Sequence, residues 1–158
     1  MNRVKRDQSG LGMIEILVAL VLLSMGLLGM AAMQMTSTKM TAQAQYKTQA
    51  LLLAQDMVER VRANRNNAQN SPGSYSINMD GSETCETDFT PGGSNVATND
   101  TQEWVNSVRC LLPDGQGTVA VSTTPDTVNM TLSWETRMAE DDDAFIENQD
   151  TLAMTARF

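Results

Sequence analysis

The amino-terminal stretch SGLGMIEILVALVLLSMGLLGMAAMQM, residues 9 to 35, decides the fold of this chain. Residues 16 to 35 contain twenty positions without a formal charge, which is about the length that an α-helix needs to cross a bilayer. Residues 1 to 10 are polar and contain three basic side chains against one acidic side chain. Because basic residues favour the cytoplasmic side, we expect the amino terminus in the cytoplasm and the rest of the chain on the outer side of the membrane.

The order of these features differs from that of an ordinary export signal. An ordinary signal peptide is cleaved after its apolar stretch, usually at an A-x-A site. Here Gly10, a small residue suited to cleavage, precedes the apolar stretch. Glu15 lies inside the apolar start, where a lone carboxylate costs roughly 2.5–3.5 kcal/mol at a helix centre and less near the membrane face. This cost indicates a function for Glu15, and the alternative is a plain signal anchor with an incidental glutamate.

The stretch SGLGMIEILVAL, residues 9 to 20, resembles the class III signal of type IV prepilins, in which Gly precedes Phe-Thr-Leu-Ile-Glu and an apolar helix. The resemblance implies that Gly10 ends a leader, that Leu11 is the new amino terminus and the site of N-methylation, and that Glu15 is the fifth mature residue. Two positions depart from the usual signal: Leu11 replaces Phe or Met, and Gly12 replaces Thr. Glycine at this place should loosen the first helical turn.

Glu15 also has a physical reason to be where it is. Cleavage after Gly10 leaves a charged amine on Leu11 in an apolar environment, where an unpaired charge is expensive. A Glu15 carboxylate of one subunit can pair with the amine of a neighbouring subunit and offset both costs. We interpret this pair as a checkpoint for assembly, because it forms only when subunits stack in register.

Beyond the apolar stretch, the helix is predicted to continue to about Asn64 as a stem with one buried stripe. The stripe consists of apolar residues spaced by threes and fours, interrupted at Lys47: Met40, Ala44, Leu51, Ala54, Val58 and Val61. An Asn-rich segment closed by Pro72 and Gly73 follows and is predicted to end the stem. Three arginines at its carboxyl end, at positions 60, 62 and 65, are interpreted as a helix cap and solvated surface, with partner binding as the alternative.

The rest of the chain alternates apolar and polar residues, which predicts strands with one buried face. Four segments show this pattern: Tyr75, Ile77 and Met79; Val119 and Val121; Val128, Met130, Leu132 and Trp134; Leu152, Met154, Ala156 and Phe158. Helical spacing from Trp104 to Leu112 predicts a short helix that Pro113 ends. Residues 81–93 and 140–148 are expected to form surface loops.

The predicted fold class is therefore α+β, with a long amino-terminal helix packed on a small antiparallel sheet. We expect four segments: a leader at 1–10, a transmembrane or filament-core helix at 11–35, an amphipathic stem at 36–65 and a head domain at 66–158. A single domain is all that 158 residues allow, apart from a stalk.

Charge and composition limit what the head can do. Residues 66 to 158 contain fifteen acidic and three basic side chains, a net charge of −12. Such a head repels phosphate backbones, so no nucleic-acid partner is expected. The chain has no histidine, which argues against catalytic triads and most zinc sites. We expect no enzyme activity, no cofactor and no metal, although the acidic run Glu140–Asp143 leaves calcium open.

Two cysteines, Cys85 and Cys110, lie in the head. In a small exported domain, two such cysteines most often pair, and the alternative is two reduced thiols. Closing a loop of this size would stabilise the fold by roughly 3–4 kcal/mol on the chain-entropy model. A head with few aromatic residues gains a useful share of its stability from such a bond.

Further patches narrow the resemblance to minor pilins of the PilV type, also called type IV pilus modification proteins. The patches are LLLAQDMVERVRANR at residues 51 to 65, the W-x-x-x-V-x-x-L-L-P-x-G-x-G-x-V pattern at residues 104 to 119, and VNMTLSW at residues 128 to 134. This resemblance implies a low-abundance subunit of a type IV pilus that helps to prime assembly.

The same resemblance implies the partners and the location. The partners are the prepilin peptidase/N-methyltransferase, the major pilin, other minor pilins and often a large tip adhesin. The location is the inner membrane, with a periplasmic head, and then the pilus at the cell surface. Two alternatives stay open: an I-type pseudopilin of type II secretion, and a membrane-anchored binding protein. The place in the filament, the direct neighbours and any receptor do not follow from the sequence.

Overall fold

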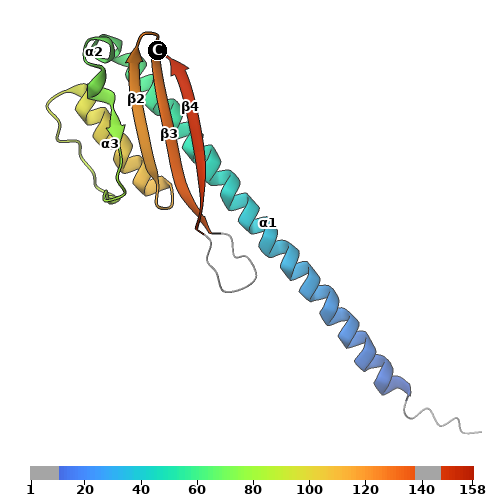
Figure 1. Cartoon of the computed structure of the whole chain (residues 1–158). Helices are drawn as coiled ribbons and strands as arrows, with labels where there is room; N and C mark the ends of the chain where they lie inside the picture. The colour runs from blue at the N-terminus through green and yellow to red at the C-terminus, as the bar shows by residue number, and fades with distance from the viewer. Residues whose placement is uncertain (1–10, 138–146) are drawn as a thin grey trace, which may run out of the picture. The chain divides into compact units, whose positions relative to one another are not determined.

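The structure is a computed structural model that describes residues 11–137 and 147–158. The fold is α+β, with a long amino-terminal helix and a four-stranded antiparallel sheet (Figure 1). The elements in chain order are α1 (Leu11–Ala63), α2 (Arg65–Asn70), the 3-10 turn η1 (Pro72–Tyr75), β1 (Ile77–Asn78), α3 (Val96–Leu111), β2 (Gln116–Thr123), β3 (Asp126–Arg137) and β4 (Glu147–Arg157). The chain divides into two compact units between Thr41 and Ala42, and each is described by itself.

Helix α1 extends over 53 residues because nothing in its sequence interrupts it. It contains no proline and is rich in Ala, Leu, Met and Gln, which are strong helix formers. Its threonine hydroxyls donate to carbonyls four residues earlier, for example Thr38 Oγ1 to Gln34 O at 2.9 Å. The helix ends at Ala63, within one residue of the predicted end at Asn64.

The buried side of α1 in the second unit differs from the predicted stripe. Ala54, Val58 and Val61 are buried as predicted, but Leu51 is 41% exposed, and Met40, which belongs to the first unit, is 64% exposed. The actual buried set is Ala50, Leu53, Ala54, Met57, Val58 and Val61. A strict three-four pattern drifts by about 20° per seven residues on a straight helix, so the predicted stripe rotates away from the buried side toward its amino-terminal end.

The sheet has the strand order β1-β2-β3-β4, and all neighbours are antiparallel. The predicted strands are confirmed, and their alternating apolar residues face the core. Residues that are buried there include Val119, Val128, Met130, Leu132 and Trp134. Strand β1 is shorter than predicted because Tyr75 belongs to η1, whose backbone closes with a Ser76 N–H to Gly73 O bond of 3.2 Å.

Three further differences concern the ends and connections of elements. Helix α3 begins at Val96, eight residues before Trp104, because the Asn95 side chain accepts a hydrogen bond from Thr98 N at 2.9 Å and caps the helix. The Asn-rich segment predicted to end the stem contains a further short helix, α2, which buries Ala68. Residues 147 and 148, predicted as loop, lie in β4.

Trp104 connects three elements of the second unit. Its indole is fully buried, and its Nε1 donates to Leu53 O of α1 at 2.9 Å. A Cβ on Gly117 would lie 2.8 Å from the ring, so only glycine lets β2 pass this close to the indole. Trp104 therefore packs α3 against both β2 and the last part of α1.

Candidate functional site

The amino-terminal site begins where α1 begins. Leu11 is the first residue of the helix, and Gly10 lies outside the described residues. Glu15 lies about one turn into the helix, and its side chain is exposed. Among the described residues, Glu15 makes no ion pair, so its carboxylate is available to a group from outside the chain.

The helix that follows Glu15 is apolar on all sides. Its large apolar side chains from Met13 to Met35 are each more than half exposed. The helix contains an 18-residue window of mean hydropathy 2.5, and by length and composition it can cross a membrane. Such a segment is stable only where a lipid or protein environment covers it.

The last turns of α1 present a charged cluster to α3. Arg60 bonds Asp56 at 2.8 Å on its own helix, and Asp100 at 3.2 Å and Glu103 at 2.7 Å on α3. Burial disfavours the charge of Arg60, but its hydrogen bonds to Glu103 and Asp56 outweigh burial and raise its pKa. Arg60 is thus an internal tie between two helices of the second unit, and its prediction as solvated surface is wrong.

Tyr75 extends this cluster into the core. Its hydroxyl donates to Asp100 Oδ2 at 2.7 Å and accepts from Asn64 Nδ2 at 3.1 Å. Burial, together with the hydrogen bond to Asp100, raises the pKa of Tyr75 to about 12. The cluster joins the end of α1, η1 and α3.

The other two arginines at this end of α1 also contact the head. Arg62 Nη2 donates to Arg157 O at 2.7 Å, at the end of β4. Arg65 Nη2 lies 3.0 Å from Asp126 Oδ2, at the start of β3. Both side chains are about half exposed, so each pair contributes up to about 1 kcal/mol.

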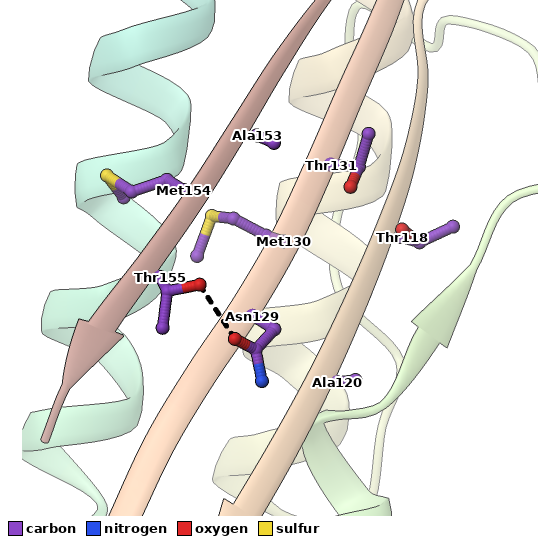
Figure 2. Close-up of a pocket in the computed structure, with 8 residues that line it drawn as sticks. All are labelled: Thr118, Ala120, Asn129, Met130, Thr131, Ala153, Met154 and Thr155. Atoms are coloured by element: carbon purple, nitrogen blue, oxygen red, sulfur yellow. Dashed lines mark hydrogen bonds between the residues drawn. The ribbon is translucent and has the colours of Figure 1, made fainter.

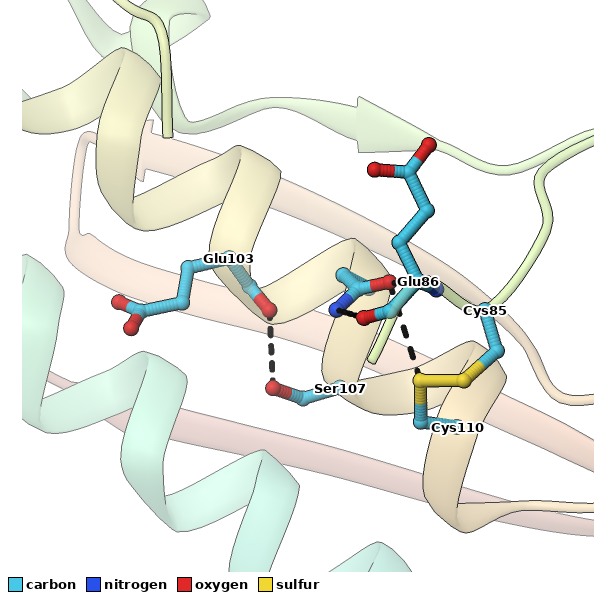
Figure 3. The surroundings of a disulfide bond; sticks show 6 residues. Cys85, Glu86, Glu103, Ser107 and Cys110 are labelled. Atoms are coloured by element: carbon cyan, nitrogen blue, oxygen red, sulfur yellow. Dashed lines mark hydrogen bonds between the residues drawn. A yellow bond between two sulfur atoms is a disulfide. The ribbon is translucent and has the colours of Figure 1, made fainter. Parts of the chain in front are cut away.

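Cys85 and Cys110 form the predicted disulfide, with a Cα–Cα distance of 4.8 Å (Figure 3). The bond joins the loop before α3 to the last turn of α3. Next to it, the Asn106 side chain bonds both backbone groups of Glu86: Oδ1 accepts from Glu86 N at 2.8 Å, and Nδ2 donates to Glu86 O at 2.9 Å. Asn106 Oδ1 also lies 3.8 Å from Cys110 Sγ, a plain contact because a disulfide sulfur has no hydrogen to donate.

The same face of α3 holds the rest of the loop. We define the amide stripe as Asn95, Asn99, Gln102 and Asn106, which are spaced by four, three and four residues. Gln102 Oε1 accepts from Gly92 N at 3.2 Å, and Asn99 Oδ1 accepts from Gly93 N at 2.8 Å. The stripe and the disulfide therefore fasten the irregular loop between β1 and α3, residues 79–95, to α3.

The outer face of the sheet is uncharged in its centre. Figure 2 shows the residues that line a shallow hollow there, including Thr118, Asn129 and Ala153, with Thr155 Oγ1 donating to Asn129 Oδ1 at 2.8 Å. Among the residues that the structure describes, no charged one lines this hollow. The face stands in contrast to the acidic composition of the head.

The structure therefore brings together some of the sequence-predicted residues and not others. It joins Cys85 to Cys110, and it places Leu11 and Glu15 at the start of α1. The candidate calcium ligands Glu140–Asp143 lie outside the described residues. Sequence reasoning missed the Arg60 cluster and the amide stripe. The stripe had a detectable signal, because amide side chains recur at helical spacing before the predicted start of α3.

Comparison with known families agrees with this arrangement. Residues 5–31 match the model of the prokaryotic N-terminal methylation motif, and residues 32–102 match the family model described as Type IV pilin Tt1218. The two matched segments adjoin. No curated protein and no solved structure matches the chain. Residues 5–31 thus match an N-terminal methylation motif and the adjoining residues 32–102 match a Tt1218-like type IV pilin model, and the long helix with an antiparallel sheet is consistent with the fold of type IV pilins.

Proposed function

We propose that this chain is a minor subunit of a type IV pilus that helps to prime assembly of the filament. One observation carries the proposal: Glu15 is exposed near the start of the described part of α1, in an apolar helix whose large side chains from Met13 to Met35 are each more than half exposed. An acid at this place serves no contact within the described chain. A neighbouring subunit with a free amine at Leu11 supplies the missing partner.

Processing creates that amine. A prepilin peptidase/N-methyltransferase removes residues 1–10 after Gly10 and methylates Leu11. The Glu15 carboxylate then pairs with the amine of the next subunit, which fixes the axial position of one subunit against another. Subunits that have not been cleaved lack the amine and do not enter the filament.

The chain divides accordingly into a leader at 1–10, a membrane or filament-core helix at 11–35, a stem at 36–65 and a periplasmic head at 66–158. Before assembly, the helix anchors the subunit in the inner membrane with its amino terminus in the cytoplasm. After assembly, the subunit belongs to the pilus at the cell surface. The subunit acts through contacts and performs no catalysis.

The minor role rests on the resemblance to pilins of the PilV type at residues 51–65 and 104–119. Other minor pilins, the major pilin and often a large tip adhesin are the partners that this role implies. The acidic head, with net charge −12, suits protein partners and disfavours nucleic acid.

The test is an intact-mass measurement of the chain extracted from membranes of the cell that produces it. We expect a mass lower by residues 1–10 and higher by one methyl group. Gly10→Glu should leave the chain uncleaved, because the peptidase site requires a small residue, whereas the matched variant Gly12→Ala should be cleaved normally. A mature chain that retains residues 1–10 would indicate a membrane-anchored binding protein and would contradict the proposal.

A second measurement tests the minor role. Deletion of the gene should reduce the number of pili, and the processed chain should be rare in sheared filaments relative to the major subunit. If deletion leaves piliation intact and blocks protein secretion instead, the chain is an I-type pseudopilin. If the chain is the most abundant subunit of the filament, the minor role is wrong.

A further inference from the structure

Strand β4 is an edge strand of the sheet, and every second residue of β4 points its backbone N–H and C=O groups away from β3. Gly117 O of β2 accepts from Met79 N, so the odd-numbered residues of β2 point toward β1 and its even-numbered residues bond β3. In the register of β3 with β4, the even-numbered residues of β3 lie opposite the even-numbered residues of β4 and form hydrogen bonds with them. Thr151, Ala153 and Thr155 therefore point their N–H and C=O groups outward, and no described residue bonds these groups.

Arg157 confirms this orientation. Arg157 is also an odd-numbered residue of β4, so its carbonyl points outward. This carbonyl accepts hydrogen bonds from Arg62 Nε at 3.1 Å and Nη2 at 2.7 Å. At the other end of the strand, Asp150 lies 3.7 Å from Lys47. The open edge thus spans Thr151 to Thr155, between two contacts with α1.

The open edge lacks the usual protection against strand pairing. Edge strands are normally blunted by charged residues, proline or bulges. The segment TLAMTA, residues 151 to 156, has no charge and no proline, and its ladder with β3 continues without a bulge. Its core-facing residues Leu152, Met154 and Ala156 are only partly buried, whereas their neighbours in β3 are buried. The apolar core is therefore incomplete at this edge.

The net charge of the second unit limits which kind of segment can cover this edge of the core. Residues 42 to 158 contain seventeen acidic and seven basic side chains, a net charge of −10. If two copies of the chain paired through β4, their second units, which are both strongly acidic, would repel each other. A segment without acidic residues and with net positive charge is complementary instead.

We propose that the edge of β4 binds an extended segment of another protein, which adds a fifth strand to the sheet. The outward N–H and C=O groups of Thr151, Ala153 and Thr155 pair with the backbone of that segment. Its alternate residues are apolar and cover Leu152, Met154 and Ala156, and its flanks are basic. This inference goes beyond the proposed function and does not depend on cleavage after Gly10.

The test measures amide hydrogen exchange of the full chain in detergent micelles. The probe is the synthetic peptide KTVTVTVTK, and the matched control is ETVTVTVTE. The amides of Thr151, Ala153 and Thr155 should exchange rapidly in the free chain and about tenfold more slowly when KTVTVTVTK is present at ten times its Kd. The acidic peptide should bind at least about tenfold more weakly, because the second unit of the chain is also acidic and repels it.

Two variants at one position sharpen the test. Ala153→Pro removes an outward N–H without removing a ladder bond, which edge strands tolerate, and it should abolish protection by the peptide. Ala153→Thr keeps the N–H and should retain it. Protection in wild type is measured independently of whether Ala153→Pro folds. Three results would overturn the proposal: no protection up to the solubility limit of KTVTVTVTK, equal binding of both peptides, or a free chain that already pairs with a second copy through β4.

Discussion

The two ends of α1 are continuous in backbone and opposite in environment. From Met13 to Met35, each large apolar side chain is more than half exposed, whereas Ala54, Met57 and Val61 near the other end are fully buried. The difference follows from pattern. Continuous apolar residues cover all sides of a helix, and apolar residues at helical spacing cover one side.

This difference shows where each region obtains the free energy of burying its apolar side chains. Burying one large aliphatic side chain stabilises a structure by about 1.5–3 kcal/mol. The carboxyl-terminal region obtains this free energy within its own chain, through the core that includes Met57 and Trp104. The amino-terminal region obtains it only from lipid or protein outside the described chain. A substitution in one region should therefore affect assembly, and a substitution in the other should affect folding.

The largest expected effect is that of Glu15→Ala on assembly. Removal of the carboxylate leaves the amine of a neighbouring subunit as an uncompensated charge, and loss of one member of a buried pair costs about 3–5 kcal/mol. We expect normal amounts of processed chain in the inner membrane and a large decrease in sheared filaments, measured by quantitative immunoblotting. Glu59→Ala, at an exposed position of the same helix, is the control and should enter filaments normally. Normal entry of Glu15→Ala would refute the charge pair.

In contrast to Glu15→Ala, the variant Trp104→Ala should affect the folding of the head. It removes a buried indole and its hydrogen bond to Leu53 O, and tryptophan-to-alanine changes in cores cost about 3–5 kcal/mol. Chemical denaturation of the full chain in detergent, followed by circular dichroism, should show a lower midpoint for the head. Leu52→Ala, at a residue that is 59% exposed, should cost much less. Equal costs for the two variants would contradict the core described here.

Loss of the disulfide should destabilise the head and leave the membrane segment unchanged. The bond joins residues with a sequence separation of 25, for which the chain-entropy model gives about 3–4 kcal/mol. Cys85→Ser combined with Cys110→Ser should lower the denaturation midpoint and increase proteolysis of the loop before α3. Insertion of α1 into membranes, measured by carbonate extraction, should remain as in wild type. An unchanged midpoint would show that the amide stripe alone holds the loop.

The smallest effect is a dependence of stability on pH. The folded state raises the pKa of Tyr75 from 10.0 to about 12, so the unfolded chain loses this proton first as the pH rises. The contribution is fully present below pH 10 and is lost between about pH 10 and 12. In Tyr75→Phe, stability should decline less over this range than in wild type, after a loss of about 1–3 kcal/mol at neutral pH from the hydrogen bond to Asp100. Parallel declines in the two proteins would contradict this assignment.

Much of the fold could be predicted because its signals are local. The uncharged stretch, the helical spacing before Asn64 and the alternation in β2, β3 and β4 each act over a few neighbouring residues. Where the sequence prediction was wrong, the cause is tertiary. Leu51 and Leu53 are equally apolar, and only the direction of the core decides that Leu53 is the buried one.

The contacts within the head could not be predicted for a related reason. Arg60 lies forty residues before Asp100, and a basic residue at a helix end usually faces solvent. Only the packing of α3 against α1 places the two side chains together. Cys85 and Cys110 were easier, because two cysteines allow a single intramolecular pair.

The loop before α3 has a property that follows from how the amide stripe holds it. Each of the four hydrogen bonds from Asn99, Gln102 and Asn106 contacts the loop's main chain, at the amides of Glu86, Gly92 and Gly93 and the carbonyl of Glu86. Main-chain groups are the same in almost every residue type, so the exposed side chains between Glu86 and Pro91 can be exchanged while these four hydrogen bonds are kept. Substitutions at these exposed positions are therefore expected to keep the conformation of this part of the loop, whereas Gly93, where a Cβ would lie 2.7 Å from Asn99 Oδ1, should not accept a larger residue.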